Sequence, residues 1–196
     1  MSSTDAGAAG SEALGAAERR TLLALARDSI AYALAHQQLP TIRVEDHAPP
    51  LREVRASFVT LTIGGQLRGC IGSLEAFRPL VLDVSTNACA AAFRDPRFRP
   101  LTAGEFPALQ VQVSVLSTPA PMSFRDAADL VCQLRPGTDG LIIQLGDRRA
   151  TYLPTVWQNL PDRQIFFKEL KRKAGIGNGE DLAGLKAWRY ETECFS

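Results

Sequence analysis

One segment of the chain brings together residue types that could do chemistry: Leu67–Ser73, with the letters LRGCIGS. A cysteine is a nucleophile, and a soft metal ligand, in its thiolate form, and a neighbouring guanidinium favours that form. Glycines within a strand let a ligand or another backbone approach closely. We therefore take this segment as the candidate functional centre, with Cys70 as the candidate catalytic nucleophile and Arg68 beside it.

A second interpretation of the same residues is purely structural. Most free cysteines are small buried hydrophobes, and Arg68 would then pair with a carboxylate. Gly69 and Gly72 could equally permit a bulge or tight packing on a helix. A cysteine hydrolase also needs a general base, and neither His36 nor His47 belongs to the segment. Both interpretations stay open at this point.

The segment lies in the second strand of a predicted hairpin. Two β-rich runs, Ser57–Ile63 and Gln66–Ile71, flank the pair Gly64-Gly65. A two-residue glycine turn between such runs is typical of a β-hairpin. Both faces of the hairpin carry large apolar groups, which predicts that both faces are covered and that the segment forms the floor of a cleft.

The predicted turn also fixes which side chains share a face. With that turn, Leu61 lies opposite Arg68. Two residues along, Val59 lies opposite Cys70, because the residues of a strand alternate between its two faces. Arg68 and Cys70 are therefore predicted to point from the same face into the cleft.

Charged residues after the next helix form a second group of candidates. Arg78-Pro79 opens a helix predicted to run to about Phe93, and the prolines of Asp95–Pro100 cannot continue it. Asp95 and Arg97 could form a rim that holds an anionic substrate, since arginine offers a forked set of donors. Structural ion pairs at the helix end are the alternative. The candidate substrate-binding residues are Arg68, Gly69, Ile71, Gly72, Ser73, Asp95 and Arg97.

The rest of the pattern predicts an α+β fold. The remaining predicted elements are helices at 16–36, 124–134, 156–160 and 162–174, and strands at 109–116, 141–145, 148–153 and 185–195. We expect a mostly antiparallel sheet flanked by helices, with a smaller α/β subdomain and a cleft between them. Residues 1–15 are predicted to form a disordered tail, because small and polar residues bury too little surface to offset the entropy of ordering. Residues 16–196 form the folded domain, which has one or two subdomains.

The composition limits the class of function. Of the 196 residues, 45% are hydrophobic and 22% are charged, and the net charge is +1. An ordinary globular protein has this balance, whereas a dedicated nucleic-acid binder carries a strong positive field. A basic cluster, Lys168–Lys173, complements the dipole at the end of a predicted helix and is interpreted as a solvated face. Nucleic-acid binding is therefore not expected.

The cysteines and histidines are scattered along the sequence. The four cysteines form no CxxC pair, and two histidines are too few for the usual zinc or facial-triad patterns. We therefore expect free thiols and no intrinsic metal site. The sequence has no apolar run of about 18 residues and no signal peptide. We expect a cytoplasmic protein that does not enter a membrane.

Five motifs carry a resemblance to a known family. They are Arg68–Gly72, Asp95–Phe98, Val113–Ser117, Pro136–Leu141 and Leu153–Trp157. In this order the motifs are similar to those of the AMMECR family, the A component of AmmeMemoRadiSam systems. The resemblance covers about residues 18–195.

The resemblance implies a two-part α+β fold with a largely antiparallel sheet, and a cleft toward which the motif strand Arg68–Gly72 faces. It also implies two partners, a Memo-type protein and a radical-SAM enzyme, and no cofactor of the chain's own. We therefore expect a binding or accessory component of a modification system, which holds a small-molecule or modified substrate. The alternatives are a stand-alone enzyme with Cys70 as its nucleophile and a nucleic-acid binding module.

Overall fold

The structure is a computed structural model, and it describes residues 13–196. Residues 1–12 of the predicted tail, 1–15, lie outside the described residues. Leu14, near the end of that stretch, is only 2% exposed and packs in the first hydrophobic core. Core packing therefore includes a residue that lies two positions before the first helix, which starts at Ala16.

The described chain divides into two compact units. Unit 1 comprises the residues up to Thr118 together with Phe195–Ser196, and unit 2 comprises Pro119–Cys194. Each unit has a hydrophobic core. No helix within residues 13–196 combines the length and hydropathy needed to cross a membrane.

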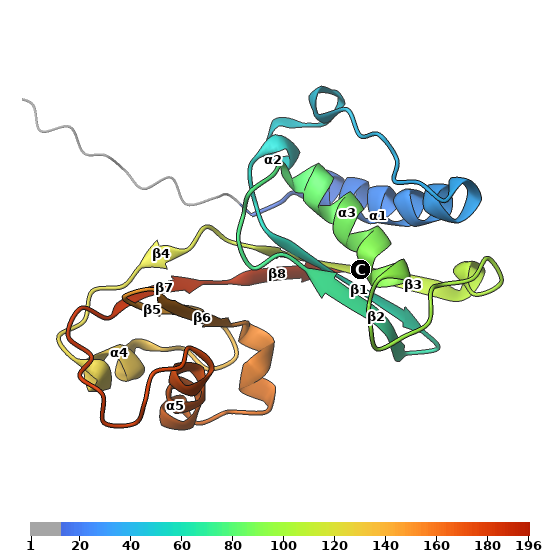
Figure 1. The fold of residues 1–196 in the computed structure, drawn as a ribbon. Helices are drawn as coiled ribbons and strands as arrows, with labels where there is room; N and C mark the ends of the chain where they lie inside the picture. The colour runs from blue at the N-terminus through green and yellow to red at the C-terminus, as the bar shows by residue number, and fades with distance from the viewer. Residues whose placement is uncertain (1–12) are drawn as a thin grey trace, which may run out of the picture. The chain divides into compact units, whose positions relative to one another are not determined.

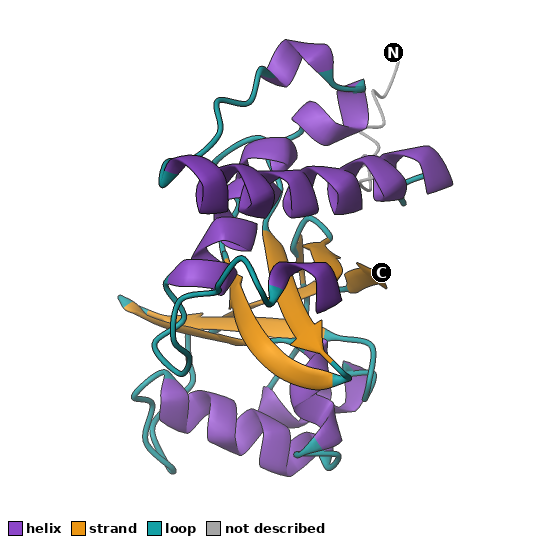
Figure 2. Cartoon of the chain, turned by 90° about the vertical axis from the view of Figure 1, so that its right-hand side faces the viewer, coloured by secondary structure: helices purple, strands orange, loops and turns teal. Residues whose placement is uncertain are grey.

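Unit 1 is built from helices packed on a sheet. Its elements are α1 (Ala16–His36), η1 (Val44–Asp46), α2 (Pro49–Arg52), β1 (Ser57–Ile63), β2 (Gln66–Gly72), α3 (Leu80–Phe93), η2 (Phe106–Ala108) and β3 (Leu109–Leu116). The sheet has the strand order β2-β1-β3-β8, in which β8 (Thr192–Phe195) ends in unit 1. Helices α1 and α3 lie on the same face of this sheet (Figure 1, Figure 2). β2 is therefore an edge strand with one face toward the helices.

The packing of unit 1 follows from the alternation of its strands. Val59 and Leu61 of β1 are fully buried, and β3 contributes valines to the same core. Alanines along α3, among them Ala88 and Ala91, let the helix approach the sheet closely. α3 is therefore held near enough to β2 to dictate which residues β2 can carry there.

Unit 2 is a second, smaller α+β arrangement. Its elements are β4 (Ala120–Pro121), α4 (Ala127–Gln133), β5 (Gly140–Leu145), β6 (Arg148–Tyr152), η3 (Pro154–Gln158), α5 (Arg163–Lys173) and β7 (Lys186–Tyr190). The antiparallel sheet has the order β4-β7-β5-β6. In its core, the ring of Trp157 stacks on Phe166 at 3.7 Å between centroids. The side chain of Asp162 caps α5 by accepting the main-chain N–H of Ile165 at 2.9 Å.

The predicted α+β class with mostly antiparallel strands is confirmed. Most element boundaries agree with the prediction to within two residues, and two elements differ more. The helix predicted at 124–134 begins at Ala127, because the side chain of Asp126 caps it by accepting the main-chain N–H of Asp129. The strand predicted at 185–195 is divided into β7 and β8. The predicted cleft between the subdomains stays a prediction.

Candidate functional site

The hairpin that carries the motif contains a β-bulge. Ile63 pairs with Gln66 next to the turn, but Leu61 pairs with Gly69 instead of the predicted Arg68, because the register shifts by one residue. Arg68 is therefore the extra residue of the bulge, which disrupts the ladder locally. The predicted pairs of Leu61 with Arg68 and of Val59 with Cys70 are wrong, and the shared face inferred from them loses its basis.

The close approach of α3 explains the bulge. Leu61 faces the core, so its partner on β2 faces α3 as well. A Cβ atom added at Gly69 would collide with the carbonyl oxygen of Ala91 on that helix. Arginine cannot occupy such a position, and the bulge brings Gly69 to it while Arg68 remains outside the ladder. Gly69 is thus explained by packing.

Cys70 lies on the face of β2 that points away from the helices, since it alternates with Gly69. It pairs with Thr60, whose hydroxyl donates to the half-buried thiol at 3.3 Å. Ile71 faces the other way and packs against the first core. A Cβ atom at Gly72 would collide with the ring of Phe58, so this glycine is also explained by packing.

Arg68 forms a forked ion pair with Glu105. Its Nε donates to Oε1 at 2.7 Å and its Nη2 to Oε2 at 3.2 Å. Glu105 also accepts the main-chain N–H and the hydroxyl of Thr102, at 2.9 and 2.8 Å. The Arg68 guanidinium, with these two donors of Thr102, lowers the pKa of Glu105 to about 2. The Arg68 side chain is 14% exposed, and its Nη1 is buried without a partner among the described residues.

Asp95 and Arg97 cover the free edge of β2 at Cys70. The buried carboxylate of Asp95 accepts the main-chain N–H of Cys70 at 2.9 Å and the Nη2 of Arg97 at 2.7 Å. Arg97 also donates to the carbonyl of Cys70 at 3.3 Å. The Arg97 guanidinium holds the pKa of Asp95 well below its ordinary value. An exposed strand edge invites pairing with another chain, and this ion pair closes it.

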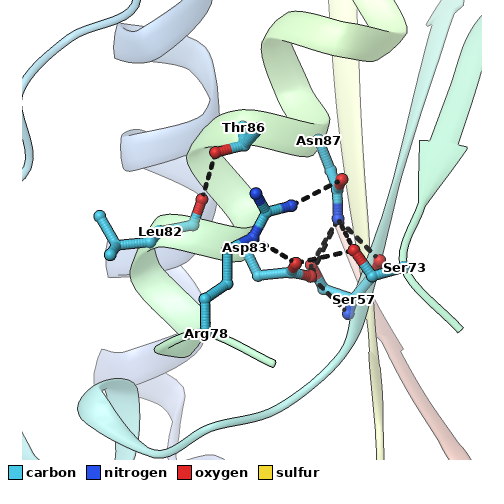
Figure 3. Close-up of polar contacts among 7 residues, drawn as sticks. All are labelled: Ser57, Ser73, Arg78, Leu82, Asp83, Thr86 and Asn87. Carbon is cyan, nitrogen blue, oxygen red and sulfur yellow. Dashed lines mark hydrogen bonds and ion pairs between the residues drawn. The ribbon is translucent and has the colours of Figure 1, made fainter. Parts of the chain in front are cut away.

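Ser73 belongs to a buried polar network centred on Asp83 (Figure 3). Its hydroxyl donates to Asp83 Oδ1 at 2.8 Å, and Arg78 Nε donates to the same oxygen at 2.8 Å. The other oxygen, Oδ2, accepts the N–H and the hydroxyl of Ser57 at 2.8 and 2.6 Å and Asn87 Nδ2 at 2.9 Å. The network ties β1, the end of β2 and α3 together.

The sequence interpretation missed this network. Asp83 and Asn87 are one helical turn apart in an otherwise apolar helix, and both are buried. Two polar residues at i and i+4 on the apolar side of a helix are a usable signal, because buried polar groups require partners. Ser57 gave no such signal, because a serine at the start of a strand is ordinary.

The structure thus gathers the predicted residues around one strand. The side chains with free or exchangeable polar atoms are Arg68, Cys70 and Arg97. Gly69, Ile71 and Gly72 serve packing, and Ser73 serves the Asp83 network. Within residues 13–196 no three His, Cys, Asp or Glu side chains are grouped as metal ligands would be. This arrangement can bind a polar or anionic group beside a thiol.

The basic cluster at the end of α5 makes local contacts. Arg172 pairs with Glu169 at 2.8 Å, and Lys173 donates to the carbonyl of Thr151 at 3.0 Å. The ammonium of Lys171 lies 5.5 Å from the centroid of the Phe167 ring. These contacts fit the interpretation of a solvated face.

Comparisons with known proteins extend over both units. A family model described as AMMECR1 matches residues 23–195. A protein of Methanothermobacter thermautotrophicus is 40% identical over 165 residues, which cover 81% of this chain and 83% of the relative. A protein of Thermofilum pendens is 33% identical over 202 residues, which cover 93% and 91%. The crystal structure of the uncharacterized protein PH0010 from Pyrococcus horikoshii matches with a TM-score of 0.73 and 30% identity, covering 90% of this chain and 89% of that one.

Proposed function

The chain belongs to the AMMECR1 family, and from that premise we propose that it is the binding component of a modification system. Its partners are a Memo-type protein and a radical-SAM enzyme. The chain holds a small-molecule or modified substrate at the surface around β2, where Arg68, Cys70 and Arg97 contact it. The chemical change is made by a partner.

The unused donor of Arg68 carries this proposal. Nε and Nη2 are held by Glu105, whereas Nη1 is buried without a partner among the described residues. A buried N–H without a partner costs roughly 1–3 kcal/mol. In native proteins such groups usually meet a water, an ion or a ligand. An acceptor oxygen of the substrate removes that cost.

The surroundings of Cys70 favour binding over covalent catalysis. The hydrogen bond to its thiol comes from the Thr60 hydroxyl, at 3.3 Å. Among the described residues no histidine, lysine or carboxylate side chain is hydrogen-bonded to the sulfur. Nucleophilic catalysis by a cysteine requires a base or a strongly activating neighbour, and the nearby guanidinium of Arg97 is already compensated by the carboxylate of Asp95. The thiol therefore contributes to the binding surface.

Complementation of a deletion strain tests the proposal. Untargeted mass spectrometry identifies the compound that accumulates when the gene is deleted, and variants are then scored by how far they restore its level. We expect Cys70→Ser to restore the normal level of the compound. We expect Arg68→Gln to leave most of the compound accumulated, because a hydrogen bond to a charged group is worth about tenfold or more in affinity. Two exposed positions, Arg20→Gln and Cys132→Ser, are the controls.

Each result bears on one part of the proposal. Full restoration by Arg68→Gln, or an unchanged metabolite profile in the deletion strain, overturns the binding role. Loss of function in Cys70→Ser, with the variant folded and abundant, points to the stand-alone cysteine enzyme. Co-purification of the tagged chain with the Memo-type protein checks the partnership separately.

A further inference from the structure

A groove of about 650 Å³ lies in unit 1 between α1 and β3. No residue of the motif segment Leu67–Ser73 lines it. Its walls are Leu23, Ala24 and Arg27 of α1, Leu109–Gln112 of β3, Thr62 and Ser196. The groove is thus separate from the surface around β2, and nothing in the proposed function uses it.

One wall of the groove is the edge of strand β3 at Leu109–Gln112. The carbonyl of Leu109 points away from β1, because it accepts Arg27 Nη1 at 2.6 Å. In an antiparallel sheet the N–H and C=O of residues two apart point to the same side. The N–H and C=O of Val111 therefore point the same way, toward the groove that Val111 lines.

The neighbouring strand β8 is shorter than β3. β3 has 8 residues and β8 has 4, so β8 can pair with at most half of β3. Ser196, which follows β8 directly, lies at the groove with Leu109–Gln112. The groove is the open space beside Leu109–Gln112 of β3.

Arg27 supplies a positive charge without a counter-ion. It donates to the carbonyls of Leu109 and Phe106 at 2.6 and 3.3 Å, and its guanidinium lies 4.6 Å from the centroid of the Phe106 ring. All three partners are neutral, and within the described chain no carboxylate pairs with it. A guanidinium has five N–H donors, so donors remain for an anionic group in the groove.

One side of the groove is apolar and the other is polar, because apolar and polar residues alternate along β3. Leu23 and Val111 present apolar side chains on the helix side. Gln110 and Gln112 alternate with Val111 along β3 and present amides on the other face. An extended peptide whose apolar and polar residues alternate matches both sides at once.

We infer that this groove is a docking site for an extended peptide segment of a partner protein. The segment adds as a strand beside Leu109–Gln112 and bonds to the main chain of Val111, and an acidic side chain of the segment pairs with Arg27. Main-chain hydrogen bonds provide affinity, and the charge and the alternation provide selectivity.

Nuclear magnetic resonance titration of the full chain tests the inference. The probes are nine-residue peptides in which valine, isoleucine or phenylalanine alternates with threonine around a central glutamate. Each is compared with the same peptide carrying glutamine, and glutarate serves as a small dicarboxylate. We expect the amide signals of Leu109 and Val111 to shift when a peptide binds. We expect the glutamine peptides to bind more weakly than the glutamate peptides, by about fivefold or more, because they lose one forked but solvated ion pair.

Variants assign the binding to the groove. Arg27→Gln should weaken the glutamate peptides by about fivefold or more and abolish the preference for glutamate over glutamine peptides, whereas the exposed Arg20→Gln on the same helix should change neither the affinity nor the preference. The inference is overturned if no peptide of the set binds, if binding moves other amides but not those of Val111 and Leu109, or if Arg27→Gln has no effect. Saturation of the same amides by glutarate alone would show a small-molecule pocket instead of a peptide site.

Discussion

Two buried aspartates hold the motif strand, Asp95 at Cys70 in its middle and Asp83 at Ser73 just beyond its end, and their surroundings differ. Asp83 is 1% exposed and gathers donors from β1, from the end of β2 and from α3. Asp95 is paired with a single guanidinium, that of Arg97, whose side chain is 54% exposed. The first carboxylate is sealed within the fold, whereas the partner of the second meets solvent. Asp83 thus acts as an anchor, and Arg97 can exchange a contact for a ligand.

Removal of the sealed carboxylate should have the largest effect on stability. Asp83→Ala leaves Arg78 and several buried donors without an acceptor, and breaking a buried ion pair of this kind costs about 3–5 kcal/mol. Urea unfolding measures the change in free energy of unfolding. Asp28→Ala, at an exposed position on α1, should stay within about 0.5 kcal/mol. A loss below about 1 kcal/mol for Asp83→Ala would remove the distinction between the two aspartates.

The bulge that separates Arg68 from the ladder can be broken at Gly69. The methyl group of Gly69→Ala meets the Ala91 carbonyl, and overpacking of this kind costs roughly 1–3 kcal/mol. Gly104→Ala is the matched control, because nothing lies within 4 Å of a Cβ atom there. Equal urea midpoints for the two variants would contradict the close approach of α3.

The ion pairs Asp95–Arg97 and Glu105–Arg68 should make the free energy of unfolding fall as the pH is lowered. The folded pKa values of Asp95 and Glu105 are lowered, the latter to about 2, mainly by Arg97 and Arg68. The stabilisation is therefore complete above the unfolded values of about 4 and is lost as the pH falls through the folded values. Asp95→Asn with Glu105→Gln should flatten the decline in unfolding free energy between about pH 5 and pH 2. An equally steep decline in this double variant would assign it to other carboxyl groups.

The smallest expected effect is a difference in the rates at which the cysteines are labelled. It tests whether the thiol of Cys70 is activated. Cys132 is exposed, Cys70 is half-buried, and burial raises the pKa of Cys89 to about 11. The thiolate is the reactive form, so among these three cysteines iodoacetamide should modify Cys132 first, Cys70 more slowly and Cys89 last, as followed by peptide mass spectrometry. Faster labelling of Cys70 than of Cys132 would indicate an activated thiolate and revive the cysteine-enzyme alternative.

Much of the local structure could be predicted from the sequence. Gly64-Gly65 fixed the hairpin turn, since both residues have positive φ angles, 58° and 78°. Thr102 and Glu105 have capping-box spacing, and Glu105 accepts both donors of Thr102. The alternation of Leu109–Leu116 predicted β3 with the observed bounds. Such features depend on residues close together in the chain, and local spacing is what a sequence displays.

The sequence by itself determined the α+β class, the family resemblance and the strand that carries the candidate site. Only the tertiary structure decided the register of that strand and the partners of its side chains. The register at Arg68 depends on how closely Ala91 of α3, 22 residues further along the chain, approaches Gly69. Steric contact sets that distance, and the spacing of residues in the sequence does not reveal it. The partners of Asp83 and Asp95 likewise come from separate elements. A buried carboxylate must find donors wherever the fold brings them, so its role is fixed only when the chain is packed.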